Sequence, residues 1–304
     1  MRKPLSWCLG LAIAAIVVGV AARAVRAQAA QTPTRYQAMG LVLAVDAAHQ
    51  TFIASIDRIP GVMDAMSMPF RVREARDLAS VVPGAFVDFT LVIGADASYA
   101  EGIHVRRTGS LEQDPLIARR LSVMRQVASG RAPAVLPIGA HVPDFHLIDQ
   151  NSRPVSLSEF AGKVVAINFM YTTCQLPDFC LRIVNHFGAL QKRFAADLGR
   201  NLIFLTMSFD PIRDQPDVLT RYAAQWSPNP QTWHFLTGAP DEVERALEAF
   251  GVAAFPDEGL MDHSLHTVVI TRDGTLAANI EGNQYTSDQL GDLIARVVGG
   301  GTRQ

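Results

Sequence analysis

Two cysteines lie close together near the middle of the chain, directly after a run of apolar residues. The run, Lys163-Val-Val-Ala-Ile-Asn-Phe-Met170, is typical of a buried parallel strand. Cys174 and Cys180 follow it and precede a predicted helix near residues 179–197. A helix N-terminus lowers the pKa of a thiol, and the thiolate is both the nucleophile and the metal ligand. The fold must therefore present both thiols at the carboxyl end of a buried strand.

An imidazole stands far downstream, in the motif Met261-Asp-His263-Ser264. Two thiolates and one imidazole form a small set of soft ligands that suits Cu(I). The same two thiols without the imidazole would suffice for a redox dithiol. The residues alone leave both interpretations open.

The composition favours a globular protein of two domains. A chain of 304 residues can build two separate cores. The formal net charge of −2 and the isoelectric point near 6.4 argue against a general nucleic-acid binder.

Residues 1–27 have the layout of a secretory signal peptide. Arg2 and Lys3 precede an apolar run over 9–22, and small-residue cleavage sites follow it. The run is shorter than the roughly 20 residues of a membrane-spanning helix, although an uncleaved N-terminal anchor with membrane contact stays an alternative. We therefore expect an exported protein, in the periplasm or at the periplasmic face of the inner membrane. Cys8 precedes the apolar run and would leave with the signal peptide.

Cys174 and Cys180 are then the only cysteines of the mature chain. A structural disulfide is the simplest interpretation of such a pair in an oxidising compartment. A link across so short a loop constrains the unfolded chain little, however, so it would add little stability. The pair is better explained by chemistry.

The sequence predicts a small all-β barrel of the OB type over residues 31–108. Short runs rich in β-branched and aromatic residues, separated by turn residues, predict its five strands at 40–46, 51–56, 70–72, 86–93 and 102–105. Residues 109–138 read as a linker, with a helix-compatible stretch before a segment rich in glycine and proline.

Strands and helices alternate over residues 139–304, which predicts an α/β thioredoxin-like domain. Helices are expected near 215–225, 241–250 and 287–298, and strands at 201–208 and 233–236. Asp273-Gly274 between 266–271 and 275–280 is a strong hairpin signal.

Several motifs of this second domain resemble the Sco/SenC family. They are Gly162-Lys-Val-Val-Ala-Ile-Asn-Phe-Met-Tyr-Thr-Thr-Cys174, Met207-Ser-Phe-Asp-Pro211, Leu236-Thr-Gly238 and Met261-Asp-His-Ser264. The family consists of thioredoxin-fold copper proteins that help assemble the copper centre of cytochrome c oxidase. The resemblance implies that Cys174, Cys180 and His263 bind copper, as Cu(I) or Cu(II), with Asp210 and Asp262 nearby. It implies cytochrome c oxidase subunit II as the copper-accepting partner.

The cysteine spacing departs from this resemblance, because five residues intervene where the family has three. Positions six apart on a regular helix face different directions. Both thiols can reach one metal only if residues 175–177 form a loop and the helix begins near Asp178, a start that Pro177 favours.

Ile59-Pro-Gly-Val-Met63-Asp-Ala-Met66-Ser-Met68-Pro-Phe70 resembles the methionine motif of small periplasmic copper-binding barrels of the CusF type. Thioethers are soft, neutral ligands for Cu(I), and Met66 and Met68 would share one face of a strand. The histidine of that family is missing, since Ser55 and Ile56 stand at its place. The alternative is that Met63, Met66 and Met68 are flexible packing residues.

The other histidines lack a ligand-like pattern and are expected to be surface or core residues: His49, His104, His141, His146, His186 and His234. His266 is the one competitor of His263, and we expect it inside a strand.

The leading hypothesis is a periplasmic copper chaperone that is not an enzyme. A second hypothesis is a thiol–disulfide reductase with Cys174 as the attacking thiolate and Cys180 as the resolving one, acting on a thiol–disulfide exchange partner. Copper buffering in copper resistance is a further alternative, and peroxidase activity is a weaker one.

Overall fold

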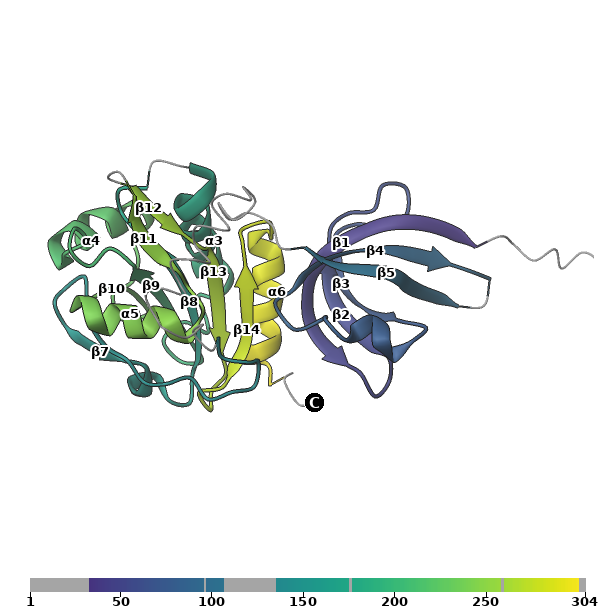
Figure 1. The fold of residues 1–304 in the computed structure, drawn as a ribbon, viewed down its shortest axis with the longest axis horizontal. Coiled ribbons are helices and arrows are strands. Elements are labelled where there is room, and N and C mark those ends of the chain that lie inside the picture. The colour runs from purple at the N-terminus through teal and green to yellow at the C-terminus, as the bar shows by residue number, and fades with distance from the viewer. Residues whose placement is uncertain (1–32, 96, 107–134, 175–176, 258–259, 301–304) are drawn as a thin grey trace, which may run out of the picture.

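The computed structural model describes residues 33–95, 97–106, 135–174, 177–257 and 260–300. The predicted signal peptide with Cys8 and most of the predicted linker lie outside the described residues, and so does its helix-compatible stretch. Figure 1 shows two halves side by side, a barrel and a thioredoxin-like half. No helix within the described ranges has the length and apolar character needed to cross a membrane.

The barrel half is one antiparallel sheet of five strands in the order β3-β2-β1-β4-β5. The strands are β1 (Thr34–Asp46), β2 (Thr51–Ile56), β3 (Met66–Arg71), β4 (Phe86–Ile93) and β5 (Ser98–Arg106). A parallel bridge between Val72 and Ala100 brings the two edges of the sheet together. In its core Phe52 and Phe70 stack on each other, and Phe89 meets both rings edge to face. The predicted small β domain is confirmed.

Strand β3 begins at Met66, earlier than the predicted start at residue 70. Pro69 lies inside it, opposite Ile53 of β2. A proline lacks the backbone donor of a sheet ladder and is tolerated on an edge strand, which is where β3 lies. Because a proline argues against a strand, the sequence pattern did not predict the first part of β3.

The thioredoxin-like half is built on a sheet in the order β14-β13-β8-β9-β10-β6-β7. Its bounds are β6 (His146–Asp149), β7 (Pro154–Ser156), β8 (Val164–Met170), β9 (Leu202–Ser208), β10 (Trp233–Thr237), β13 (His266–Ile270) and β14 (Leu276–Glu281). Strands β8, β9 and β10 run parallel, and every residue in them is buried. Such continuous apolar runs are expected where helices cover both faces.

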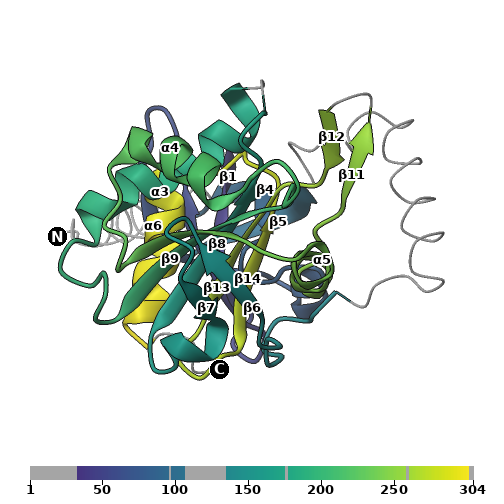
Figure 2. The same cartoon turned by 90° about the vertical axis from the view of Figure 1, so that its left-hand side faces the viewer.

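The helices are α3 (Arg182–Arg193), α4 (Pro216–Ala223), α5 (Pro240–Ala249) and α6 (Ser287–Val298). Figure 2 shows α3 and α6 on one face of the sheet and α5 on the other. Helices α4 and α5 begin at prolines, whose fixed φ suits the first helical position. The predicted α/β fold is confirmed for this half.

Two short hairpins were not predicted, β6–β7 and the pair β11 (Ala254–Asp257) and β12 (Leu260–His263). Helix α3 also begins later than predicted. Residues Pro177–Leu181 form a π-helical turn in which Phe179 has φ −109° and ψ −109°, outside the helical region, so regular helix starts only at Arg182.

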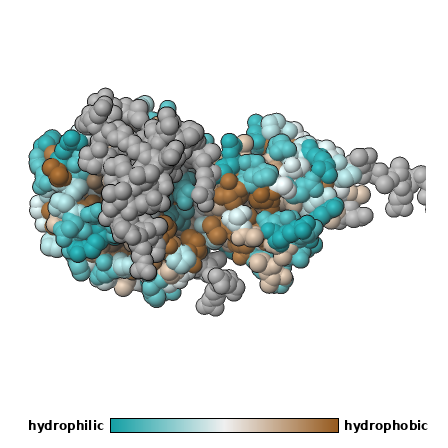
Figure 3. Space-filling view, viewed as in Figure 1, coloured by the Kyte–Doolittle hydropathy of each residue, from teal (hydrophilic) through white to brown (hydrophobic). Residues whose placement is uncertain are grey.

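The two halves pack against each other through apolar residues. Leu41, Leu43 and Phe86 of the barrel belong to the same buried cluster as the core of the thioredoxin-like half. Figure 3 shows hydrophobic residues gathered on the side of the barrel that faces the other half. Gly84 has φ +90°, and a Cβ there would lie 3.1 Å from the Cβ of Ala278 on β14. The close approach of this turn to β14 therefore favours glycine.

Candidate metal centre

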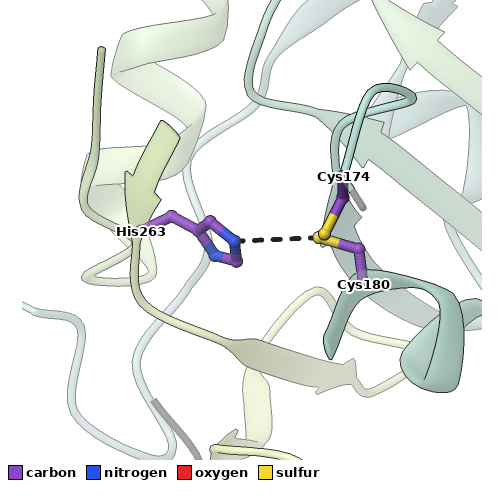
Figure 4. Close-up of side chains that lie close together, drawn as sticks. All are labelled: Cys174, Cys180 and His263. Atoms are coloured by element: carbon purple, nitrogen blue, oxygen red, sulfur yellow. Dashed lines mark hydrogen bonds between the residues drawn. The ribbon is translucent and has the colours of Figure 1, made fainter. Parts of the chain in front are cut away.

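Two thiols and one imidazole converge at the carboxyl edge of the sheet. The ligand atoms of Cys174, Cys180 and His263 all lie within 4.8 Å of one another. They come from three segments: the connection after β8, the turn before α3 and the end of β12. Figure 4 shows the imidazole pointing at the two sulfur atoms. Among the described residues, no other group of three histidines, cysteines and carboxylates has this geometry.

The loop that carries Cys174 is held by a buried carboxylate. Asp214, which has no exposed surface, accepts hydrogen bonds from the backbone N–H and the hydroxyl of Thr172. It also accepts from the hydroxyl of Ser208 at the end of β9. Asp214 therefore ties the loop after β8 to the loop after β9. The sequence prediction overlooked this residue, because Thr172 and Ser208 become neighbours only when β8 and β9 pair.

Cys180 lies in the irregular turn Pro177–Leu181 rather than on the regular helix. Its side chain is completely buried, whereas that of Cys174 is half-buried. The non-helical backbone at Phe179 removes the angular mismatch that a regular helix would impose on a spacing of six positions. The long spacing is thus compatible with two thiols that meet.

His263 is placed by the base of the β11–β12 hairpin. The backbone N–H of Ser264 donates to the carbonyl of Ala253, and the Ala253 N–H donates to the Ser264 hydroxyl. These bonds fix the segment on which His263 stands, and the histidine is only 3% exposed.

The orientation of the His263 imidazole directs Nε2, and not Nδ1, toward the two thiols. Nδ1 lies 3.2 Å from the carbonyl oxygen of Ser264, which can only accept, so Nδ1 carries the proton and donates. Nε2 lies 3.7 Å from Sγ of Cys180 and presents its lone pair to the thiols. A backbone partner of this kind commonly fixes the tautomer of a metal-binding histidine.

Two aromatic rings flank the imidazole. The Phe209 ring lies 4.6 Å from it and the Tyr171 ring 5.7 Å, measured between ring centroids. Tyr171 and Phe209 follow directly after the adjacent parallel strands β8 and β9, whose last residues Met170 and Ser208 are paired. The sheet register therefore places both rings against His263 and shields the ligands from water.

The electrostatics keep the buried thiol protonated in the absence of a metal. The hydrogen bond with Cys174, followed by burial, raises the pKa of Cys180 well above the ordinary thiol value. Burial and the neighbouring cysteines raise the pKa of Tyr171 to about 12. A cation bound here would replace the Cys180 proton and relieve the repulsion between two thiolates.

The donor set fits a soft, low-coordinate cation. Two thiolates and a neutral imidazole suit Cu(I) or Zn²⁺, and the three-ligand arrangement is closer to what Cu(I) accepts than to a four-coordinate zinc site. The carboxylate of Asp210 is engaged with Arg213 at 3.1 Å. The side chain of Asp262 lies outside the described residues.

The methionines lie in the barrel half. Met66 is 49% exposed, while Met63 and Met68 are half-buried and pack against the barrel core. Met66 and Met68 pair with Ile56 and Ala54, two core residues of β2. Both methionines therefore lie on the face of β3 that points to the interior of the barrel. Ser55, at the place of the missing histidine, is buried and bonded to Asp292.

The remaining histidines are placed as follows. His49, His104, His141 and His146 are exposed. His234 is buried beside Asp149, and His186 is largely buried against Tyr285. His266 lies in β13 with Nδ1 2.8 Å from Oδ1 of Asn279.

Residues 137–299 match the SCO1/SenC family model, which is more than half of the chain. The chain belongs to the SCO1/SenC family. Residues 35–104 match a second model, the copper-binding periplasmic protein CusF. The two matches divide the chain where the barrel and the SCO1/SenC half divide in the fold.

Several characterised proteins resemble the SCO1/SenC half. A SCO1 protein homolog of Bacillus subtilis (strain 168) is 28% identical over 165 residues, covering 53% of this chain and 83% of that protein. The mitochondrial SCO1 protein of Saccharomyces cerevisiae is 27% identical over 163 residues, covering 51% of this chain and 52% of that protein.

Solved structures match the same half. Yeast Sco1 with copper bound is 26% identical, covers 54% of this chain and 90% of that chain, and gives a TM-score of 0.46. BsSco, described as a member of the Sco family of cytochrome c oxidase assembly proteins, is 26% identical. The match covers 55% of this chain and 98% of that chain and gives a TM-score of 0.47.

Proposed function

We propose that this protein is a copper chaperone that binds Cu(I) through Cys174, Cys180 and His263. The observation that carries the proposal is the convergence of two thiols and an Nε2 lone pair within 4.8 Å. The family's link to copper and to cytochrome c oxidase assembly points in the same direction.

Copper uptake exchanges protons for metal. Both cysteines must bind as thiolates, so each thiol releases its proton, while His263 already offers a neutral nitrogen. Two thiolates and one Cu(I) give the site a charge of −1 within a shell of aromatic rings. The hydrogen bond with Cys174 and then burial raise the pKa of Cys180, and the positive charge of the metal would offset this preference for the protonated thiol.

Copper release begins at the accessible ligand. Cys174 is half-buried, whereas Cys180 and His263 are buried. A thiolate of the acceptor therefore reaches the metal on the Cys174 side and displaces that ligand first. We infer that the acceptor is subunit II of a heme–copper oxidase, which meets the chaperone in the periplasm or at the outer face of the inner membrane.

The barrel, residues 31–108, adds a second and weaker copper site. Met63, Met66 and Met68 offer only neutral thioethers, so the site lacks the charge of thiolate ligands. The exposure of Met66 suits rapid exchange of the metal. In this proposal the barrel collects Cu(I) for the SCO1/SenC domain, residues 139–304, in the same chain. The match to CusF supports it.

A thiol–disulfide reductase is the second candidate, favoured by the contrast between Cys174 and Cys180. Cys174 would attack a partner disulfide and form a mixed disulfide, and Cys180 would then displace the partner thiolate. The chain would lose two electrons and the partner would gain them. Nothing in this cycle needs His263.

One experiment separates the two candidates. The reduced, copper-loaded full chain without residues 1–27 is mixed with the apo copper domain of an oxidase subunit II, and copper transfer and thiol content are both followed. His263→Ala should abolish copper transfer and leave disulfide reduction intact. Disulfide reduction by the parent without any copper transfer would contradict the chaperone function.

A further inference from the structure

A carboxylate on the last helix of the SCO1/SenC half is bonded to two strands of the barrel. Asp292 on α6 accepts a hydrogen bond from the Ser55 hydroxyl of β2 at 2.7 Å and from the Ser67 hydroxyl of β3 at 2.6 Å. Arg193 of α3 donates to its other oxygen at 2.6 Å. The arginine neutralises the carboxylate and, with both serines, lowers the pKa of Asp292.

A second residue of α6 reinforces this contact. Gln289, one turn before Asp292 and 3% exposed, donates from its amide to the backbone carbonyl of Ser55 and to the carboxylate of Asp57, both at 3.1 Å. The same side chain accepts from the backbone N–H of Thr286 and completes the capping box of α6. Its position is thus fixed by its own helix before it meets the barrel.

The strand that is held from this side carries two of the candidate copper ligands. Successive side chains of a strand point to opposite faces, so Ser67 faces α6 while Met66 and Met68 face the barrel side. The hydrogen bond from Ser67 to Asp292 therefore restrains the β3 backbone between Met66 and Met68, on the face opposite the two thioethers.

The polar contacts are backed by apolar packing. Leu41 and Leu43 of β1 and Phe86 of β4 are buried in the common cluster of the two halves. Figure 1 shows α6 between the sheet of its own half and the strands β1 and β2 of the barrel. The barrel is therefore docked on a built surface rather than tethered by its linker alone.

We propose that Asp292 and Gln289 are positioning residues for the methionine site, so that docking of the barrel and copper loading of Met66 and Met68 are coupled. This inference rests on the barrel part of the proposed function. A restrained strand loses less conformational freedom when both thioethers close on one ion. By linkage, copper on the methionines must strengthen docking by the same factor.

The first test measures docking without copper. Cys174→Ser/Cys180→Ser full chain lacking residues 1–27 is compared with the same chain carrying Asp292→Ala, and amide hydrogen exchange is followed in β2 and β3. Exchange over 66–71 should become roughly fivefold to tenfold faster, because two hydrogen bonds to a charged group are lost. Ser67→Ala should show part of the same effect.

Asp288→Ala is the matched control. Asp288 lies one turn away on α6 with a side chain that is 93% exposed, and its carboxylate reaches Arg193 only at 4.0 Å. Asp288 lies in the first turn of α6, where its charge favours the helix N-terminus, so any general loosening of α6 would appear in Asp288→Ala as well. Equal exchange in the Asp292→Ala and Asp288→Ala chains would overturn the docking role.

The second test measures Cu(I) affinity in the same cysteine-free chains by competition with a chelator. Asp292→Ala should bind about fivefold more weakly than Asp288→Ala, and copper should slow exchange over 66–71 in the parent but less in Asp292→Ala. Faster exchange with unchanged affinity would overturn the coupling. Absence of any copper binding in the parent would instead overturn the methionine site and the coupling, while the exchange result would still decide the docking.

Discussion

The chain carries two groups of sulfur side chains, the two cysteines after β8 and three methionines of the barrel, that are built in opposite ways. The thiols of Cys174 and Cys180 come from one short stretch after β8, and His263 comes from a distant hairpin that meets them at the carboxyl end of that strand. The methionine site draws all its candidate ligands from one short stretch at a sheet edge, with Met66 half exposed. The first can supply two thiolates and is mostly buried, while the second offers only neutral thioethers, with Met66 exposed. The difference suits one site for holding copper and the other for exchanging it.

The largest effect is expected from His263→Ala in the thiol site. Loss of a direct ligand should lower Cu(I) affinity by more than roughly 100-fold, since loss of outer partners alone costs about 10–100-fold. Competition with a Cu(I) chelator on the reduced full chain measures it. His266→Ala is the control, because the ring of His266 on β13 is hydrogen-bonded to Asn279 on β14. A His263→Ala chain that binds copper like the parent would place the third ligand elsewhere.

The next effect concerns Asp214, which fixes the Cys174 loop. Asp214→Ala leaves the Thr172 N–H and the Ser208 hydroxyl without their acceptor, at a cost of about 1–3 kcal/mol per buried group in the free energy of unfolding. Copper affinity should fall about tenfold, as for other groups that orient a ligand.

Asp217→Ala is its control, because Asp217 is exposed on α4 and forms an ion pair with Arg221 of the same helix. Urea unfolding of the metal-free chain and chelator competition give the two quantities. If Asp214→Ala and Asp217→Ala were equal in both, the Cys174 loop would be fixed by its apolar packing instead.

The fold was predictable where residues repeat a simple pattern. Apolar runs or turn residues predict three elements correctly: the parallel strand β8, the hairpin at Asp273-Gly274 and the helix at 287–298. The edge strand β3 was partly hidden by Pro69, and the four-residue strands β11 and β12 are too short for a periodic signal.

The site was predictable as a set of residue types but not as a geometry. A regular helix from Asp178 was expected, whereas the backbone at Phe179 leaves the helical region and Cys180 stands in a π-helical turn. Asp214 escaped prediction because its partners, Thr172 and Ser208, become neighbours only when β8 and β9 pair. The contact of Asp292 with Ser67 joins residues 225 positions apart and leaves no trace in a local pattern.

The two halves should also differ in their response to mild acid. Burial, and then Arg182, lower the pKa of His186 on α3 to about 4. The unfolded chain binds this proton near pH 6.5 and the folded chain only near pH 4, so stability falls as the pH drops through that interval. The SCO1/SenC half should lose about 3 kcal/mol of unfolding free energy over this range. In the barrel, the two histidines, His49 and His104, are both exposed.

In the chain lacking residues 1–27, and with them Trp7, tryptophan fluorescence isolates the SCO1/SenC half in urea titrations at pH 7 and pH 4.5, because Trp226 and Trp233 both lie there. His186→Gln should flatten the pH dependence of the unfolding midpoint, while His49→Gln should leave it unchanged. A parent chain with the same midpoint at both pH values would mean that His186 titrates normally in the folded state.

The smallest effect is expected at the methionine site. In a chain without Cys174 and Cys180, Met66→Leu should weaken Cu(I) binding by a factor of about 3–10, because leucine keeps the volume of methionine but offers no sulfur. Met39→Leu is the matched control, since Met39 is also exposed, on β1. Equal affinities for the two variants would reduce the methionines to packing residues.

The central claim is that the chain's tight copper site is made by Cys174, Cys180 and His263. X-ray absorption on the reduced chain lacking residues 1–27, loaded with one equivalent of Cu(I), tests it most directly. We expect two thiolate sulfurs and one imidazole nitrogen around the metal, and loss of this spectrum when the cysteines are alkylated before loading. A first equivalent bound only by thioethers, or a spectrum unchanged by alkylation, would contradict it.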